Sequence, residues 1–459
     1  MFPNPQSALP LPPRPSLERY RKIAKELVKA CRSGSKPTVS SDEPDAISLW
    51  GEAWIDDLVR LTGLTVEPQL PVRIESWIDG VAEFARRQLG KGEGDGRTCT
   101  LADAQFVIAR SHGFESWPKF ARHLEALQAV QSPEWRFEAT VDAIVSGDIA
   151  LLERLLTEEP GLVQARSMRE HGATLLHYVA ANGVEGYRQK TPQNIVEIAA
   201  MLLRAGADVN ATANVYGGGS TTLGLAATSG HPDRAGVQEE LLRVLLEHGA
   251  KIPDGTVRVC LANGRAKAAE FLASRVGHLS LAEAAGVGRL DLVEPDLVAS
   301  LGKDAALHAD AAREELQNGL LFSCQFGHDS VVDFLLKMGV DPKVSDGRGQ
   351  TALHHAVIGG HATTVRLLLE HKAPLEAKNS YGGTVLDQAL WSAAHGGDPD
   401  AYIAILEALT AAGARMPEGH VPVNSRVDAW LDEHGSRAEP GWYWSGEKPR
   451  DERQRNSRS

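Results

Sequence analysis

Histidine is the residue type in this chain with the clearest capacity for chemistry, since imidazole binds metals and transfers protons near neutral pH. The 459 residues include sixteen histidines. Four of them stand close together, at His354, His355, His361 and His371. A metal centre needs ligands that converge on one point, whereas these positions recur along the chain, His361 having counterparts at His328 and His231. We therefore expect no metal site and no cofactor.

Motifs for covalent or phosphate chemistry are absent from the sequence. It contains no HExxH and no GxSxG, and the glycine-rich run from Gly217 to Thr221 lacks the lysine of a phosphate loop. The four cysteines have no CxxC spacing: Cys31, Cys99, Cys260 and Cys324. We expect these cysteines to be free thiols in a reducing compartment. The sequence predicts a protein that is not an enzyme.

An internal repeat explains most of the histidines. Residues 318–328 superimpose on residues 351–361 at an offset of 33, and the register continues downstream, since Val332 and Leu336 correspond to Val365 and Leu369. A helix such as 365–369 is apolar along one stripe, which a single repeat cannot cover. The repeats must therefore stack on one another, which predicts a helical solenoid.

The repeated segments resemble the ankyrin-repeat family, whose units consist of a β-turn finger, a first helix opening Thr-Pro-Leu-His and a second helix ending near Gly-Ala. Thr351-Ala-Leu-His354 is the best copy, and Ala205-Gly-Ala-Asp208 and Ala412-Gly-Ala414 end second helices. The resemblance implies an all-α ankyrin-repeat solenoid of helix-turn-helix units. It also implies structural roles, in the repeat motif, for Thr351, His354, His177 and Gly360.

Periodicity and composition divide the chain into four parts. We expect a disordered proline-rich leader at 1–15, a helical N-terminal domain at 16–130, and an array of about eight repeats at 132–420 that is degenerate at 255–317. A C-terminal capping helix and a disordered tail should occupy 421–459. Residues 101–120 resemble a helical leader found ahead of ankyrin arrays in many bacterial proteins, which implies a bacterial origin.

Charge is distributed unevenly along the chain. The formal net charge is −12, but residues 1–36 carry +6 and residues 437–459 carry +2, which leaves −20 for the rest. An acidic solenoid argues against nucleic-acid binding, because phosphate contacts need a basic face. The first residues are rich in proline and lack a continuous apolar run, so we expect neither a signal peptide nor a membrane anchor. A cytoplasmic protein is the prediction.

Insertions and finger tips are the candidate binding surfaces. Three repeats carry extra residues between their helices, at 184–194, 231–237 and 392–402. The first two insertions should lie side by side, and they either form a cationic, aromatic patch or brace one edge of the array. That patch would consist of Tyr187, Arg188, Lys190, His231 and Arg234. The finger tips at Tyr216 and Tyr381 either contact a protein or pack on the neighbouring finger.

These features favour a non-catalytic protein-protein interaction module, a scaffold or regulator of an unidentified protein partner and of undefined oligomeric state. One alternative is an enzyme or small-molecule sensor with its site between the N-terminal domain and the array, near His112, Trp117 and the insertions. A second alternative is weak nucleic-acid binding through the basic termini.

Overall fold

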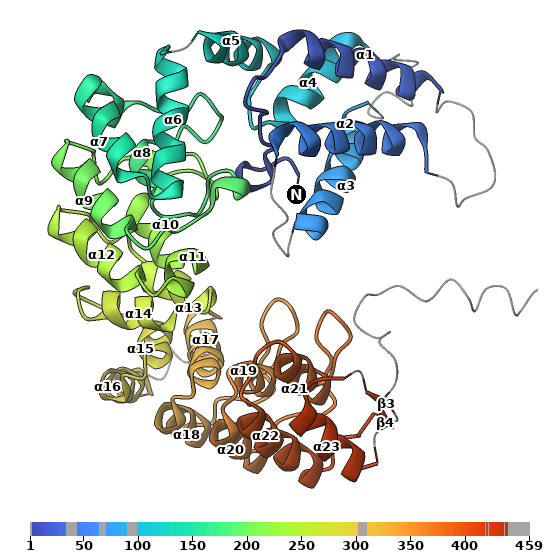
Figure 1. Cartoon of the computed structure of the whole chain (residues 1–459). Coiled ribbons are helices and arrows are strands. Elements are labelled where there is room, and N and C mark those ends of the chain that lie inside the picture. Colours follow the sequence, from blue (N-terminus) through green and yellow to red (C-terminus); the bar gives the residue numbers. More distant parts are fainter. Residues whose placement is uncertain are drawn as a thin grey trace, which may run out of the picture. The chain divides into compact units, whose positions relative to one another are not determined.

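The computed structural model describes residues 2–33, 44–63, 70–89, 99–129, 131–301, 310–417, 419–420, 422–435 and 437–438 (Figure 1). The tail predicted to be disordered, 439–459, lies outside these residues. The chain divides into two compact units, unit 1 (Met1–Thr256) and unit 2 (Val257–Ser459). None of the described helices is long and apolar enough to cross a membrane.

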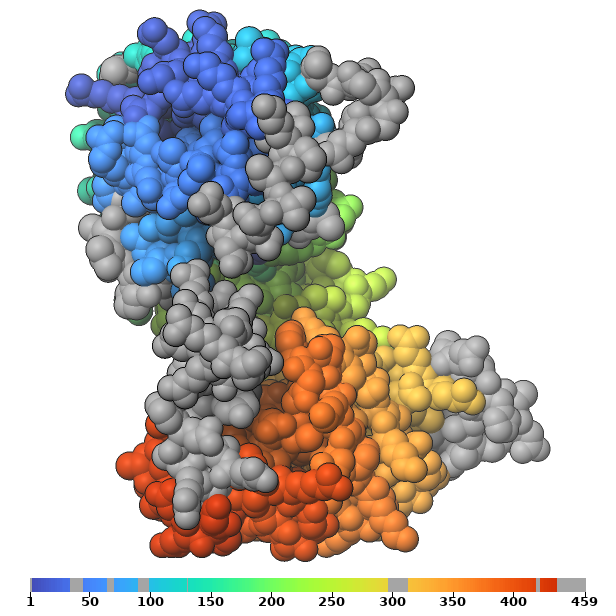
Figure 2. Space-filling view, turned by 90° about the vertical axis from the view of Figure 1, so that its right-hand side faces the viewer, coloured from blue at the N-terminus to red at the C-terminus, as the bar shows by residue number. Residues whose placement is uncertain are grey.

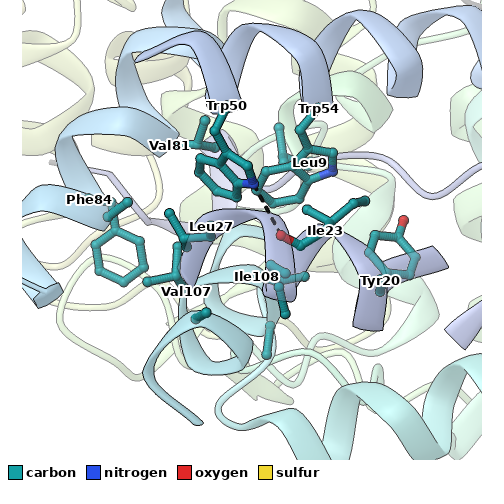
Figure 3. Close-up of a cluster of buried hydrophobic side chains, with 14 of the residues drawn as sticks. Leu9, Tyr20, Ile23, Leu27, Trp50, Trp54, Val81, Phe84, Val107 and Ile108 are labelled. Carbon is teal, nitrogen blue, oxygen red and sulfur yellow. Dashed lines mark hydrogen bonds between the residues drawn. The ribbon is translucent and has the colours of Figure 1, made fainter. Parts of the chain in front are cut away.

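Unit 1 begins with the predicted helical domain. Its helices are α1 (Leu17–Ser33), α2 (Ala46–Thr62), α3 (Leu70–Leu89), α4 (Leu101–Ser111) and α5 (Trp117–Gln128). Each presents apolar residues to a shared core, in which Trp50 and Trp54 pack beside Leu27 (Figure 3). The Trp50 indole donates a hydrogen bond of 3.2 Å to the Ile23 carbonyl, so its polar atom is satisfied inside the core. In the space-filling view these blue helices form one continuous body (Figure 2).

The proline-rich leader is ordered, so the prediction of disorder for residues 1–15 is wrong for the described residues 2–15. The 3-10 helix η1 (Pro5–Ser7) is followed by Ala8 and Leu9, which are 1 % and 0 % exposed. The Leu9 amide donates to the Ser111 carbonyl at 2.8 Å, which ties the segment to the end of α4. Prolines reduce the entropy lost on ordering, and burial of the apolar residues supplies the favourable free energy.

The remaining helices of unit 1 form the first repeats. They are α6 (Pro133–Ser146), α7 (Ile149–Glu158), α8 (Leu175–Tyr178), α9 (Ile195–Arg204), α10 (Thr222–Thr228), α11 (Gly230–Arg234) and α12 (Gln238–Glu247), with the 3-10 helices η3 (Pro160–Gln164) and η4 (Gly186–Arg188). The pairs α6/α7, α8/α9 and α10/α12 are repeats, and α12 packs on α9 (Figure 1). The strands β1 (Thr212–Ala213) and β2 (Ser220–Thr221) pair antiparallel in a finger.

Unit 2 continues the same pattern. Its repeat helices are α13 (Thr256–Ala262), α14 (Ala266–Ala273), α15 (Leu281–Gly286), α16 (Leu290–Leu301), α17 (Asp310–Phe326), α18 (Asp329–Lys337), α19 (Ala352–Ile358), α20 (Ala362–Glu370), α21 (Val385–Ala394) and α22 (Pro399–Ala411). Successive second helices α18, α20 and α22 pack side by side. Residues 274–280 join α14 to α15 without a finger hairpin, so the degenerate region is a shortened repeat.

The end of the array is closed by α23 (Ser425–Glu433), which packs on α22. The short strands β3 (Gly419–His420) and β4 (Arg437–Ala438) pair in parallel beside it. Val427 and Leu431 are 0 % exposed, so this helix covers the apolar face that the last repeat would otherwise present to water.

Local sequence sets the start of each first helix. Thr351 caps α19, because its hydroxyl accepts a hydrogen bond from the His354 amide at 3.4 Å. The stacked stripe that follows is buried, with Val365 and Leu368 of α20 both 0 % exposed. At the end of α20, Lys372 adopts a φ of 61° where the equivalent residue of the preceding repeat is Gly339, so a residue with a side chain is strained there.

Candidate protein-interaction site

In each of two fingers of unit 2, an Asp or Asn side chain accepts hydrogen bonds from the backbone of the turn. Asp346 accepts hydrogen bonds from the amides of Arg348 and Gln350, at 2.8 and 2.9 Å. One repeat later, Asn379 accepts from the amides of Tyr381 and Gly383, at 3.0 and 3.1 Å. Such side-chain turns fix the backbone of a short loop. Both fingers project on the same side of the helices (Figure 1).

Adjacent fingers are joined to each other, and Tyr381 lies at the tip. The Ser380 amide donates to the Arg348 carbonyl at 2.8 Å, so the two loops support one another. Tyr381 is 78 % exposed, the highest value among the large apolar residues described as exposed. An exposed tyrosine on a fixed turn offers a large contact area with little loss of conformational freedom on binding.

The finger of unit 1 displays Tyr216 in a different way. Tyr216 has a φ of 51° and is 64 % exposed, and three glycines with positive φ follow it and allow the tight return to β2. Its hydroxyl donates to Asn182 at 2.6 Å and accepts from the side chain of Gln6 in the N-terminal segment. The ring of Tyr216 is therefore exposed while its hydroxyl is held within the chain.

The repeat histidines join first helices to the next finger. The Nδ1 atom of His354 accepts from the Thr351 amide at 3.2 Å, and its Nε2 atom lies 3.4 Å from the Gly383 carbonyl. His177 is placed in the same way, 3.1 Å from the Thr174 amide and 3.3 Å from the Ser220 carbonyl. Burial lowers the pKa of His177 to about 4, so its imidazole is neutral. Gly360, with a φ of 75°, follows α19.

The histidines that recur after each first helix also bond backbone across repeats. His328 Nε2 lies 3.0 Å from the Gly286 carbonyl, and His361 Nε2 lies 3.1 Å from the Gln325 carbonyl. These histidines therefore stabilise the contact between neighbouring repeats. The described part of the chain contains no group of three or more His, Cys, Asp or Glu side chains able to hold a metal ion.

The first insertion, 184–194, is where the structure departs most from the sequence analysis. Arg188 is only 7 % exposed, and its guanidinium contacts Glu138 of α6 at 2.6 Å and Asp142 at 2.8 Å. Tyr187 is half-buried, and burial raises its pKa to about 12. The exposed cationic patch predicted around Arg188 is therefore wrong, because α6 supplies carboxylates that hold this side chain inside the protein.

The other predicted patch residues are less buried than this arginine, and the Lys190 amide donates to the Arg188 carbonyl at 2.8 Å. Lys190 and Arg234 are exposed, and His231 is half-buried in α11, which forms most of the second insertion. The third insertion, predicted at 392–402, is largely helical. Its Tyr402 is 3 % exposed and donates to the Val357 carbonyl at 2.9 Å. This hydrogen bond therefore ties the start of α22 to the end of α19.

Arg188 belongs to a buried ionic cluster, formed by Glu138, Arg169, Glu185 and Arg188. Arg169, 3 % exposed, contacts Glu138 at 2.7 Å and Glu185 at 2.9 Å. Burial alone would raise the pKa of Glu138, but the two guanidinium groups outweigh it and lower the pKa to about 2. Burial would also raise the pKa of Glu185, but Arg169, His171 and Arg188 hold it well below its usual value. Both carboxylates are therefore ionised at neutral pH and are unsuited to general acid or base catalysis.

His112 and His123 lie where the helical domain meets the first repeat. His112 is 0 % exposed, stacks on Phe120, and bonds the Leu9 carbonyl through Nδ1 at 3.1 Å; burial lowers its pKa to about 3. His123 is 1 % exposed, and burial lowers its pKa to about 4. Neither ring nitrogen has a hydrogen-bond partner among the described residues, and Nε2 lies 3.7 Å from the Glu138 carboxylate. A cavity of about 110 Å³ lies beside His123, bounded also by Phe137, Glu138 and Met168. Trp117 packs against the core of the helical domain.

Comparison with known proteins identifies the repeats. Residues 171–214 match the family "Ankyrin repeat", and residues 320–416 match "Ankyrin repeats (3 copies)". A similar solved structure is that of the human ASB11 ankyrin repeat domain, which is 21% identical and covers 61% of this chain and 99% of that chain. The TM-score is 0.28. No curated protein matches the chain.

The fold class follows from the family matches and the helix pairs. The protein is an all-α ankyrin-repeat solenoid preceded by a helical N-terminal region. Ankyrin repeats are in general scaffolds for protein-protein interaction, and the fold alone does not define which partner is bound.

Sequence reasoning missed the ionic cluster, although two signals were present. Glu138 directly follows Phe137 and precedes Val141 on the buried face of α6, and a carboxylate on such a face requires a buried cation. Glu185 and Arg188 stand three residues apart within an insertion, a spacing that brings side chains together in a helical turn.

Proposed function

We propose that this protein binds a protein partner through the finger tips of its repeat array, without catalysis. Tyr381 carries the proposal, because its exposed side chain stands on a turn fixed by Asn379 and by the neighbouring finger. Aromatic residues are enriched in protein interfaces and often contribute most of the binding free energy. In unit 1 the exposed ring of Tyr216 offers a second contact of the same type.

A bacterial cytoplasm is the proposed setting. The resemblance of residues 101–120 to leaders of bacterial ankyrin proteins supports the origin. The described structure contains all four cysteines as thiols outside any disulfide, three of them buried, which supports a reducing compartment.

Capture of a partner from host lysate tests the proposal. The full-length protein and the variants Tyr381→Ala and Tyr216→Ala are immobilised and compared, with Val72→Ala as the matched control, since Val72 is 69 % exposed and belongs to α3 rather than to a finger. We expect one protein to be enriched by the parent chain and by the Val72 variant, and at least tenfold less by a tyrosine variant, a loss of about 1.4 kcal/mol or more. Equal capture by all variants would oppose the proposal. A fall in melting temperature that parallels the lost capture would show that the tyrosines are structural.

A second candidate function rests on the cavity beside His123. The imidazole of His123 is almost fully buried, borders a space of about 110 Å³, and makes no hydrogen bond to the described residues, although its Nε2 atom lies 3.7 Å from the Glu138 carboxylate. This arrangement supports the alternative of a small-molecule sensor at the junction of the helical domain and the array. A thermal-shift screen with polar metabolites tests it. A compound that stabilises the parent protein but not His123→Phe would favour this function, and no stabilisation by any compound would remove its support.

A further inference from the structure

Two cysteines of the helical domain meet in space although they lie far apart in sequence. Cys31 is in the last turn of α1, and Cys99 immediately precedes Thr100, the capping residue of α4. The helices α1 and α4 pack together, Cys99 belongs to the core of this domain, and Cys31 packs against that core. The thiol of Cys99 is hydrogen-bonded to that of Cys31. A disulfide requires the two side chains to approach closely, and thiols in hydrogen-bond contact meet that first condition.

The two thiols differ in their access to solvent. Cys31 is half-buried, whereas Cys99 is 7 % exposed. Burial and the hydrogen bond to Cys31 raise the pKa of Cys99 to about 12, so its thiol is protonated at neutral pH. An oxidant in solution therefore meets Cys31 first, and Cys99 is placed to react only with the sulfur of Cys31.

We propose that Cys31 and Cys99 form a reversible disulfide under oxidising conditions, with a low-molecular-weight disulfide such as oxidised glutathione as the oxidant. The Cys31 thiolate attacks one glutathione sulfur, which forms a mixed disulfide and releases one reduced glutathione. Cys99 then loses its proton and attacks the sulfur of Cys31, and the second glutathione leaves with that proton. The protein dithiol is oxidised by two electrons, and one oxidised glutathione is reduced to two thiols.

The position of the two residues gives the disulfide a structural consequence. A bond between residues 31 and 99 would join the end of α1 to the start of α4 and close the intervening chain into a loop. Cross-linking restricts the unfolded chain more than the folded one, so the oxidised helical domain should melt at a higher temperature than the reduced one. Cys260 and Cys324 provide an internal comparison, because both are 0 % exposed and lie in unit 2.

The experiment uses the full-length protein, incubated under native conditions with oxidised glutathione and then alkylated in denaturant. Before alkylation, we expect the oxidised chain to have a mass about 2 Da lower than that of the reduced chain. After alkylation, two of the four cysteines should be unmodified, and a cross-linked peptide should contain Cys31 and Cys99. Dithiothreitol should restore four reactive thiols and lower the melting temperature again. Cys260→Ala/Cys324→Ala should still form the cross-link, and Cys31→Ser and Cys99→Ser should each abolish it.

Three results would overturn the proposal. The first is alkylation of all four thiols after oxidation. The second is glutathione that stays attached to Cys31 while Cys99 remains reduced, and the third is a cross-link between other cysteines. Circular dichroism of each variant shows whether it is folded. The double variant keeps the test valid if either serine variant is unfolded, because it retains both cysteines of the pair.

Discussion

Substitution of Arg169 by Met should destabilise unit 1 far more than an average surface change. The Met side chain retains most of the aliphatic part of Arg169 but removes the charge that contacts Glu138 and Glu185. In the variant, the Glu138 carboxylate still has the Arg188 guanidinium at 2.6 Å. The Glu185 carboxylate, which is 0 % exposed, has only the more distant side chains of Arg188 at 3.7 Å and His171 at 3.6 Å. The substitution therefore leaves a carboxylate that is fully buried and poorly compensated.

The magnitude follows from that residual charge. Breaking a buried ion pair by removing one partner destabilises a protein by about 3–5 kcal/mol, whereas removing both charges together is much less damaging. We expect Arg169→Met to lower the free energy of unfolding by that amount, and Arg169→Met/Glu185→Gln to recover about 2 kcal/mol or more of the loss. Glu170→Gln is the matched control. It breaks the more exposed ion pair with Arg110, which also links the helical domain to the first repeats, and should cost less than about 1 kcal/mol.

Hydrogen exchange of amides in α8 and α9 is the suitable assay, because a chain with two units need not unfold in one step. A loss of 3–5 kcal/mol corresponds to exchange that is faster by a factor of about 100 to several thousand through global opening. If Arg169→Met exchanged no faster than Glu170→Gln, or if the double variant were less stable than Arg169→Met alone, the account of the cluster as a charge-compensated core would be refuted.

Two further predictions concern the backbone and the buried histidines. Lys372→Gly should raise the free energy of unfolding of unit 2 by about 1 kcal/mol, and Gly339→Ala should lower it by a similar amount, because both residues have positive φ. No atom lies within 4 Å of the Cβ that Gly339 would gain, so the expected loss comes from backbone strain rather than from a clash. Urea denaturation checks both variants, and a stabilising alanine would contradict the reasoning. Burial lowers the pKa values of His112, His123 and His177 to about 3, 4 and 4, so between about pH 6 and pH 4 only the unfolded chain binds these protons. The free energy of unfolding of unit 1 should therefore keep its full value above the unfolded pKa of about 6.5 and fall by up to about 4 kcal/mol per pH unit on acidification below it. A melting temperature that stays constant from pH 7 to pH 5 would argue against neutral buried histidines.

The repeats could be predicted from sequence because each carries its own local signals. A Thr cap, a structural histidine and a stripe of apolar residues recur at a fixed spacing, as in Thr351, His354 and Val365, and these contacts form within a repeat or between neighbours. These signals are weak in the degenerate stretch 255–317, where residues 274–280 join α14 to α15 without a finger hairpin.

Contacts between distant segments could not be predicted in the same way. The proline content of residues 1–15 predicted disorder, but Leu9 is buried against the end of α4, a surface that forms only when the domain folds. Arg188 was expected on the surface because an insertion with basic residues usually projects into solvent. Its carboxylate partner Glu138 lies fifty residues earlier, and no periodic pattern connects the two.

The most direct test of the central claim is a photo-crosslinking amino acid placed at position 381, with a matched sample labelled at position 72. Both sites are exposed, on a finger tip and on α3 respectively, so the reagent is equally accessible at each. The account predicts that irradiation in host cells attaches one particular protein at position 381 and not at position 72. Equal labelling at the two positions, or no adduct at position 381 while the protein remains folded, would contradict the proposal that the finger tips bind a partner.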